Sequence, residues 1–324
     1  MTSVSDAGDL LEARLPGRIG RAVPSGSFTT YRVGGPFAVL ARIDDDAALD
    51  ALSDVVRELD APVPVLVVGR GSNLLVADEG FAGVAVVLGE HFERIAVDTD
   101  HSSVLAGGSA SLPVLARRAA AAGVAGLEFY VGIPGSVGGA VRMNAGGHGR
   151  ETRDVLVDVD LVDLLGGARS TRVAGAFGFG YRYSNLADHM VVCAARFRGT
   201  ADAPEECGAR IDAIVRWRRE HQPGGANAGS VFSNPPDDTA GRLIDAAGLK
   251  GLEVGGAAVS EKHANFIAAG PTATATDVHD LIDEVRRRVA EATGTVLQTE
   301  IRLVGFAATA STPTGPEVND ATAP

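Results

Sequence analysis

Cysteines are scarce in this sequence, and its histidines lack the spacing of common metal sites. Only Cys193 and Cys207 occur in 324 residues, and neither belongs to a C-x-x-C pair. Two cysteines cannot build the disulfide network that stabilises small secreted domains. The seven histidines show neither H-x-H nor H-E-x-x-H spacing. The sequence therefore indicates neither a metal site nor a disulfide-rich fold.

Basic charge is also scarce. The chain has 29 Lys and Arg against 41 Asp and Glu, a formal net charge of −12 at pH 7. Nucleic acids and anionic membranes are bound by basic surfaces, so we expect neither as a main partner. Anionic small molecules stay possible, because a binding site needs only a few local cations. No obligate protein partner is evident.

Long apolar runs and a secretory signal are missing as well. No apolar run approaches the roughly 20 residues that span a bilayer. Residues 1–15 mix acids with scattered apolar residues and have no basic start followed by an apolar core. With 45% apolar and 22% charged residues, the composition is typical of a globular protein. We expect a cytoplasmic protein of about two domains, at roughly 150 residues each.

The first two thirds of the chain mix helical and strand-like patterns. Apolar residues recur at helical spacing over 48–59. A second helix is predicted to begin after Ser111 as N-cap and to end at Gly123. Strands are predicted at 63–68, 84–88, 95–97, 104–106, 157–161 and 191–197. This mixture predicts an α+β cofactor domain.

The pattern of predicted elements changes near residue 200. A helix ending at Arg216–Arg219 is followed by a proline- and glycine-rich loop over 222–236. A short helix closed by Gly248, an amphipathic helix over 278–289 and a strand at 296–304 are predicted next. We expect a partly flexible N-terminal segment (1–23), a cofactor domain (24–199), a substrate domain (200–306) and a disordered tail (307–324).

Two glycine-rich loops each follow a short apolar run. Glycine lets a ligand approach the backbone, and successive N–H groups in such turns form anion sites. Two such loops therefore suggest a cofactor with a diphosphate, although either loop alone also fits a tight turn. Neither matches a Rossmann or a Walker A loop. The loops read Gly69-Arg70-Gly71-Ser72-Asn73-Leu74 and Gly132-Ile133-Pro134-Gly135-Ser136-Val137-Gly138-Gly139.

Four other residues are candidates for chemistry, each with an ordinary alternative. Arg182, between two tyrosines, has the planar fork that clamps a carboxylate, or it is a surface residue. Ser230 is an acid candidate or a turn former. Glu300, in an apolar strand, is held at a site or lies on an exposed face. His263 is a catalytic candidate or a hydrogen-bonded structural residue.

The joint order of these motifs carries a resemblance that the single motifs do not. The sequence resembles the UDP-N-acetylenolpyruvoylglucosamine reductase family over roughly residues 28–305. The motifs are, in order, Thr29-Thr30-Tyr31-Arg32-Val33-Gly34-Gly35, the two glycine loops, Met143-Asn144-Ala145-Gly146-Gly147, Tyr181-Arg182-Tyr183-Ser184, Gly229-Ser230-Val231-Phe232-Ser233-Asn234-Pro235 and Thr299-Glu300-Ile301.

The resemblance implies a FAD-binding domain of the vanillyl-alcohol-oxidase (PCMH) type and a smaller α+β substrate domain. It implies noncovalent FAD, since the first loop lacks the histidine that many relatives of this fold use for attachment. NADPH would be the hydride donor, and UDP-N-acetylglucosamine enolpyruvate would be reduced to UDP-N-acetylmuramate, a peptidoglycan precursor. Because both substrates must reach the same flavin, ping-pong kinetics are expected.

The resemblance also assigns roles to residues. The family's catalytic arginine, serine and glutamate fall on Arg182, Ser230 and Glu300. Substrate contacts are implied for Arg182, Asn234, Lys250 and His263. The implied FAD contacts are Gly69, Arg70, Gly71, Ser72, Asn73, Leu74, Gly132, Ile133, Pro134, Gly135, Ser136, Val137, Gly139 and Asn144.

Some positions depart from the family pattern. Ser233 stands where the family commonly has a lysine that helps to hold the substrate diphosphate, and Lys250 or Lys262 is a possible substitute. Gly147-His148 replaces the commoner Ala-Tyr pair. The stretch between Tyr183 and Met190 is too short for a long substrate-covering loop, so the chain looks like the shorter family type. Another noncovalent-FAD oxidoreductase of this fold, or an inactive flavin-binding paralogue, is the alternative.

Overall fold

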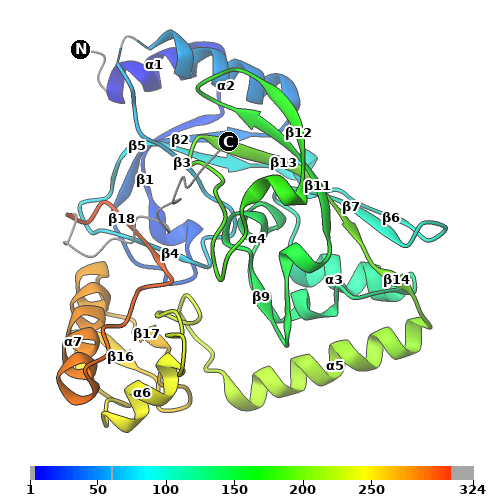
Figure 1. Ribbon diagram of the computed structural model, residues 1–324. Coiled ribbons are helices and arrows are strands. Elements are labelled where there is room, and N and C mark those ends of the chain that lie inside the picture. The colour runs from blue at the N-terminus through cyan, green and yellow to red at the C-terminus, as the bar shows by residue number, and fades with distance from the viewer. Residues whose placement is uncertain (1–3, 60, 308–324) are drawn as a thin grey trace, which may run out of the picture.

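The computed structural model describes residues 4–59 and 61–307, in which three larger sheets and three two-stranded ones pack with helices (Figure 1). The first sheet has the order β1-β2-β5-β3, with β1 antiparallel to β2 and the other pairs parallel. Its elements are β1 (Ile19–Pro24), β2 (Pro36–Ile43), β5 (Phe81–Leu88) and β3 (Val65–Val67), with α1 (Val4–Arg14) and α2 (Asp46–Glu58) packed nearby.

Helix α2 follows from its sequence pattern. Asp45 is its N-cap, since its carboxylate accepts the Ala48 N–H at 2.8 Å. Leu49, Leu52 and Val56 lie on its buried stripe and pack into one core with Val84 and Val86 of the sheet. The helix predicted over 48–59 is confirmed, and the strand predicted at 63–68 is present but shorter, as β3. The predicted N-terminal segment 1–23 contains α1 and β1, and Leu11 of α1 is fully buried in the same core.

The second sheet is antiparallel, in the order β12-β11-β13-β7-β6. Its strands are β12 (Arg169–Val173), β11 (Leu156–Asp163), β13 (Met190–Arg198), β7 (Ser103–Gly107) and β6 (Ile95–Asp98). Its core includes residues of α3 (Leu112–Ala121), α4 (Val137–Met143) and η3 (Glu128–Gly132). The strands predicted over these ranges are confirmed, with longer bounds.

The start of α3 differs from the prediction. Ser111 precedes the helix as N-cap, but its side chain makes no capping hydrogen bond. The Leu112 N–H instead donates to the Gly135 carbonyl at 3.0 Å, and Ser111 forms a β-bridge with Ser136. The second glycine loop therefore holds this end of α3, which a short-range capping pattern does not reveal.

The C-terminal part contains a third, small sheet and three helices. Helix α5 (Pro204–His221) runs along the bottom of the view and leads into this part (Figure 1). Helix α7 (Ala275–Thr293) begins with a Thr274–Asp277 capping box and ends at Gly294, whose φ is +73°. The other elements are α6 (Ala240–Ala246), β15 (Glu253–Val254), β16 (Ala257–Val259) and β17 (Ile267–Ala269). The helices predicted here are confirmed.

The last strand is shorter than predicted. Only β18 (Arg302–Val304) is a strand, and it pairs in parallel with β4 (Leu74–Val76). The preceding residues bond to a different segment: the Glu300 N–H donates to the Val231 carbonyl at 2.8 Å, and the Ser233 N–H to the Gln298 carbonyl at 2.9 Å. One extended segment therefore contacts two partners in turn.

The remaining short elements connect these parts. They are η1 (Ser25–Phe28), η2 (Glu90–Glu93), β8 (Val124–Ala125), β9 (Gly146–Gly147), β10 (Arg150–Glu151), η4 (Thr152–Asp154), η5 (Ala174–Phe177) and β14 (Thr200–Ala201). Within the described ranges, no helix is long and apolar enough to cross a membrane. The tail predicted to be disordered lies, apart from Ala307, outside the described residues.

The C-terminal part is joined to the first sheet through side chains. Tyr31 and Leu75, from the N-terminal half, are fully buried in the core formed by α6 and α7. The Asp78 carboxylate accepts the Ala275 and Thr276 N–H groups, both at 2.9 Å, and the Thr276 hydroxyl at 2.7 Å. A carboxylate from the β4–β5 turn thus caps α7.

We predict that Asp78→Ala destabilises the protein by about 1–2 kcal/mol, the range for a lost helix cap. The free energy of unfolding in urea measures this. Glu79→Ala is the matched control, because Glu79 is exposed in the same turn and should leave stability unchanged. Equal effects of the two substitutions would contradict a capping role.

Candidate active site

A cavity of about 440 Å³ is lined by both glycine loops, by residues 222–225 and 227–230, and by Arg182 and Glu300. All residues predicted to contact FAD line it except Val137 and Asn144. Val137 is fully buried in the core beneath α4. The structure therefore brings together most of the predicted cofactor residues and the three predicted catalytic residues.

The two glycine loops face each other closely. A Cβ on Gly69 would lie 2.3 Å from the Ser136 Oγ. Gly71 has a φ of +60°, and a Cβ there would lie 1.9 Å from the Phe28 carbonyl oxygen. Gly69 therefore lets the two loops approach each other, whereas Gly71 lets the first loop pack against the backbone of Phe28 and Thr29.

The residues present fit a dinucleotide cofactor. A second cavity, of about 70 Å³, shares Val67, Gly69, Ser136, Gly139, Arg142 and Arg302 with the first, so the two adjoin at the loops. The Thr30 Oγ1 is buried at the wall of the larger cavity and has no hydrogen-bond partner among the described residues. An elongated ligand with polar groups would occupy both cavities and satisfy this hydroxyl.

Arg182 is held in a strained turn with its guanidinium fixed. Gly180 and Tyr183 pair across the turn, and Arg182 has a φ of +53°, which is unusual for a residue other than glycine. Its Nε donates to Glu300 Oε1 at 2.9 Å and its Nη2 to the Gly146 carbonyl at 3.0 Å. The guanidinium also lies 4.9 Å from the Tyr181 ring centroid. The side chain is thus positioned by its surroundings.

Asn144 acts behind this turn instead of lining the cavity. It is buried, ends α4 in the left-handed conformation, and donates to Glu151 Oε2 at 3.0 Å and to the Gly180 carbonyl at 2.8 Å. Glu151 in turn lies 3.8 Å from Arg182 Nη1. Asn144 therefore positions the arginine turn, and Glu151 is a neighbouring acid that the sequence patterns did not single out.

Ser230 and Glu300 are connected through the backbone. The buried Asn265 accepts the Phe232 N–H at 2.9 Å and donates to the Phe232 carbonyl at 2.8 Å. Its own carbonyl accepts the Val231 N–H at 2.9 Å, and Val231 accepts the Glu300 N–H. The Asn73 amide, from the first glycine loop, donates to the Glu300 carbonyl at 3.1 Å. Four segments distant in sequence, around residues 73, 231, 265 and 300, thereby meet at the cavity.

The environment of Glu300 disfavours its charged form. Its side chain is 14% exposed, and burial raises the pKa of the carboxyl above its ordinary value, against the opposing effect of Arg182. Burial thus shifts this carboxyl toward its neutral form, and perturbed pKa values of this kind are typical of residues that exchange protons at a site.

The other predicted substrate residues do not line the cavity. Asn234 Oδ1 accepts the Ala240 N–H at 3.0 Å, and Lys250 Nζ donates to Asp245 at 2.8 Å. His263 Nδ1 accepts the Asn265 N–H at 3.2 Å, and burial lowers the pKa of the ring, as expected of a structural histidine. Lys262 bonds to the Arg219 carbonyl. Side-chain direction, which motif spacing does not reveal, separates these residues from the site.

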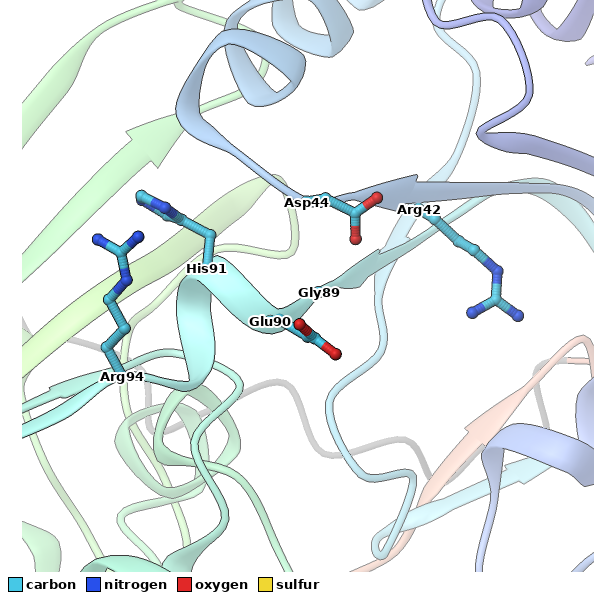
Figure 2. Close-up of a pocket in the computed structure, with 6 residues that line it drawn as sticks. All are labelled: Arg42, Asp44, Gly89, Glu90, His91 and Arg94. Atoms are coloured by element: carbon cyan, nitrogen blue, oxygen red, sulfur yellow. The ribbon is translucent and has the colours of Figure 1, made fainter.

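A separate open hollow lies beyond the ends of β2 and β5 (Figure 2). In this view the Arg94 side chain lies beside His91, whereas Arg42 points away from Asp44. None of these residues lines the glycine-loop cavity, and charges of both signs are present. The hollow contains none of the predicted site residues; it is lined by Arg42, Asp44, Gly89, Glu90, His91 and Arg94.

Comparisons with known proteins agree on one family. A family described as FAD binding domain matches residues 46–172, and the C-terminal domain of UDP-N-acetylenolpyruvoylglucosamine reductase matches residues 221–304. The UDP-N-acetylenolpyruvoylglucosamine reductase of Paramagnetospirillum magneticum is 44% identical over 95% of this chain and 98% of its own length. That of Acidiphilium cryptum is 46% identical over 90% and 92%. This chain belongs to the UDP-N-acetylenolpyruvoylglucosamine reductase family.

A solved structure of the same family supports this membership. The crystal structure of UDP-N-acetylenolpyruvylglucosamine reductase (MurB) from Thermus caldophilus aligns with a TM-score of 0.77 and 38% identity, covering 89% of this chain and 99% of that one. The expected α+β fold, a FAD-binding domain followed by a smaller reductase C-terminal domain, is therefore confirmed.

Some cavity residues were missed or left without a role by sequence reasoning. Arg302 lies two residues after Glu300, so strand alternation gave a usable signal for it. The sequence suggested no role for Arg218, at the end of a predicted helix, or for Gln222, at the start of the proline- and glycine-rich loop. For Thr30 and Phe266, the sequence indicated a site only through the motif residues next to them. The missed lining residues also include Leu112, Ala140, Arg142, Met143 and Ala145.

We predict that Glu300→Gln changes the pH dependence of stability. Because the folded pKa is raised, the folded parent binds more protons than the unfolded chain at pH values above the ordinary 4.5, so the parent loses stability as pH rises through the folded pKa. Glutamine cannot ionise, so the Tm of the variant minus that of the parent should rise with pH and then level off. Thermal unfolding of both flavin-loaded proteins across one buffer series measures it; a difference that falls with pH would contradict the raised pKa.

Proposed function

We propose that this chain reduces UDP-N-acetylglucosamine enolpyruvate to UDP-N-acetylmuramate, with noncovalent FAD as cofactor and NADPH as hydride donor. The observation that carries the proposal is the convergence of Arg182, Glu300 and Ser230 on one cavity with two glycine loops. Family membership supports the same reaction. Because NADPH and nucleotide sugars are cytoplasmic metabolites, we assign the reaction to the cytoplasm.

The glycine loops would hold the cofactor. Their backbone N–H groups, together with the Ser72, Asn73 and Ser136 side chains, would bind its polar groups, and Thr30 would add one hydroxyl. FAD, when bound, supplies the hydride chemistry, which the protein only positions. We place the boundary between the cofactor and substrate parts near residue 200, where β14 gives way to α5.

Arg182 would bind the carboxylate of the enolpyruvyl group. Addition of hydride to the β-carbon converts the double bond to a single bond and leaves negative charge on the α-carbon and carboxylate. A guanidinium fixed by Glu300 and the Gly146 carbonyl stabilises that charge where it grows. Fixing the cation before reaction avoids its reorganisation during the step.

Ser230 would donate the proton that the α-carbon then requires. A hydroxyl is a weak acid, so it serves here because the carbanion is far more basic. Glu300, whose raised pKa suits proton exchange, would orient or reprotonate this network. The two additions, hydride at the β-carbon and proton at the α-carbon, complete the reduction as NADPH is oxidised.

Steady-state NADPH oxidation with and without UDP-N-acetylglucosamine enolpyruvate tests the proposal. Rapid oxidation that depends on the sugar nucleotide is expected, with parallel double-reciprocal lines, because the two substrates occupy one site in turn. NADPH oxidation independent of the sugar nucleotide would favour another oxidoreductase, and no reaction would favour an inactive flavin-binding protein. Heat denaturation should release the flavin into the supernatant.

We predict that Ser230→Ala separates the two half-reactions. NADPH consumption needs no α-carbon proton and should continue at nearly the parent rate, whereas consumption of the sugar nucleotide should slow by more than the roughly 10²–10⁴-fold typical of a lost general acid. Rapid mixing, followed by flavin absorbance, measures each half. Ser233→Ala is the control, since Ser233 does not line the cavity. Equal slowing of both halves would mean a disturbed flavin site.

We predict that Arg182→Lys is nearly as damaging as Arg182→Ala. Lysine keeps the charge but not the planar fork that spans Glu300, the Gly146 carbonyl and a substrate carboxylate. The loss should appear in the second half-reaction, because the carboxylate gains charge only as hydride arrives. Single-turnover reaction of the reduced enzyme with the sugar nucleotide measures it, and a near-parent rate for Arg182→Lys would remove Arg182 from the catalytic residues.

A further inference from the structure

Five arginines line the large cavity, and one of them differs from the others in its partners. Four contact a carboxylate: Arg70 pairs with Glu93, Arg142 and Arg302 pair with Asp188, and Arg182 pairs with Glu300. Among residues 4–59 and 61–307, Arg218 contacts no carboxylate. Its Nε donates to Gln222 Oε1 at 2.7 Å, which leaves the two terminal nitrogens without an acceptor in the described structure.

Arg218 is seated where the last turn of α5 meets the second glycine loop. A Cβ on Gly132 would lie 3.3 Å from Arg218 Cδ and 3.6 Å from His148 Nε2. The glycine therefore leaves room for the arginine stem. Gln222, which holds the Nε, also lines the cavity and begins the linker to Ser230. Gln222 thus holds the guanidinium by one hydrogen bond, while the stem of the side chain packs beside Gly132.

The charge and burial of the Arg218 side chain favour a bound anion. Burial of the side chain lowers the pKa of the Arg218 guanidinium. The pKa of the neighbouring His148 is also lowered, first by burial of the ring and then by the positive charge of Arg218. A partly desolvated cation without a counterion is unfavourable. A planar fork with free terminal donors matches the oxygens of a phosphate or carboxylate.

The place of Arg218 in the cavity indicates which anion it binds. Arg142 and Arg302 line both cavities, at the glycine loops that fit the cofactor, whereas Arg218 lines only the large cavity, as Ser230 and Phe266 do. The carboxylate of the enolpyruvyl group is assigned to Arg182. The stem of Arg218 lies beside Gly132 of the second loop, but Arg218 does not line the smaller cavity, so the geometry favours the diphosphate of a nucleotide substrate over that of the cofactor.

We propose that Arg218 binds the diphosphate of the nucleotide that enters the cavity, either the pyridine nucleotide or the sugar nucleotide. This inference rests on the proposed function. Lys250 and Lys262 do not compete for the role, because neither lines the cavity and both make hydrogen bonds elsewhere. Arg218 is thereby a substrate-binding residue supplied by the helix that leads into the C-terminal part.

The test compares Arg218→Gln with Arg216→Gln in the flavin-loaded enzyme. Arg216 is exposed on the same helix and does not line the cavity, so it controls for the loss of one charge. Rapid mixing with NADPH gives the Kd of NADPH. The same measurement with reduced nicotinamide mononucleotide gives the Kd of a hydride donor that lacks the diphosphate. The flavin spectrum, titrated with UDP-N-acetylglucosamine enolpyruvate, gives the Kd of the sugar nucleotide.

We expect Arg218→Gln to raise the Kd of NADPH, of the sugar nucleotide, or of both by about tenfold to a hundredfold, the range for a lost charged hydrogen bond. Arg216→Gln should change neither. The Kd of the mononucleotide and the rates at saturation should stay near the parent values. An effect confined to one substrate identifies whose diphosphate Arg218 binds.

Parent-like Kd values for both substrates in Arg218→Gln would overturn the inference. Loss of flavin with unchanged substrate Kd values after reconstitution with excess FAD would overturn it too, since Arg218 would then serve the cofactor. If Arg218→Gln does not fold, Arg218→Lys, which keeps the charge without the fork, should show a smaller rise in Kd. A parent that neither oxidises NADPH nor responds to the sugar nucleotide refutes the proposed function and this inference with it.

Discussion

The site depends on one extended segment, residues 298–302, bonded on both sides by its backbone. On one side the Glu300 N–H donates to the Val231 carbonyl, and on the other the Arg302 N–H donates to the Asn73 carbonyl at 2.9 Å. The Ser230 loop, Glu300 and the first glycine loop are therefore fixed relative to one another by main-chain hydrogen bonds. Such bonds do not depend on side-chain identity, so the framework tolerates variation around the three chemical residues.

The turn Gly180–Tyr183, which contains Arg182, is the strained element that this framework supports. A left-handed arginine and a carboxyl that burial would rather keep neutral are both unfavourable in isolation. The Arg182 side chain offsets part of the cost of the buried carboxylate through its hydrogen bond to Glu300 at 2.9 Å, and Asn144 holds the strained turn from behind. A polar cluster of this kind, partly sheltered from water, strengthens any interaction with a charge that develops beside it.

Sequence patterns predicted the secondary structure better than the site. Amphipathic spacing gave α2 and α7, since a buried stripe is a local property of a helix. The strand at 296–304 was predicted too long because an apolar run does not reveal that its first half bonds to the Ser230 loop. The glycine loops were predictable from their lack of side chains. The orientation of Lys250 and His263 was not predictable. Their residue types suit contact with a substrate, but their side chains bond to Asp245 and to the Asn265 N–H.

The joint between the parts of the chain bears on how the site works. Tyr31 and Leu75 are buried in the core of the C-terminal part, and Asp78 of the β4–β5 turn caps α7. A packed core resists small displacements, because it loses many contacts at once. Ser230 therefore keeps its place opposite the glycine loops through packing as well as through the backbone.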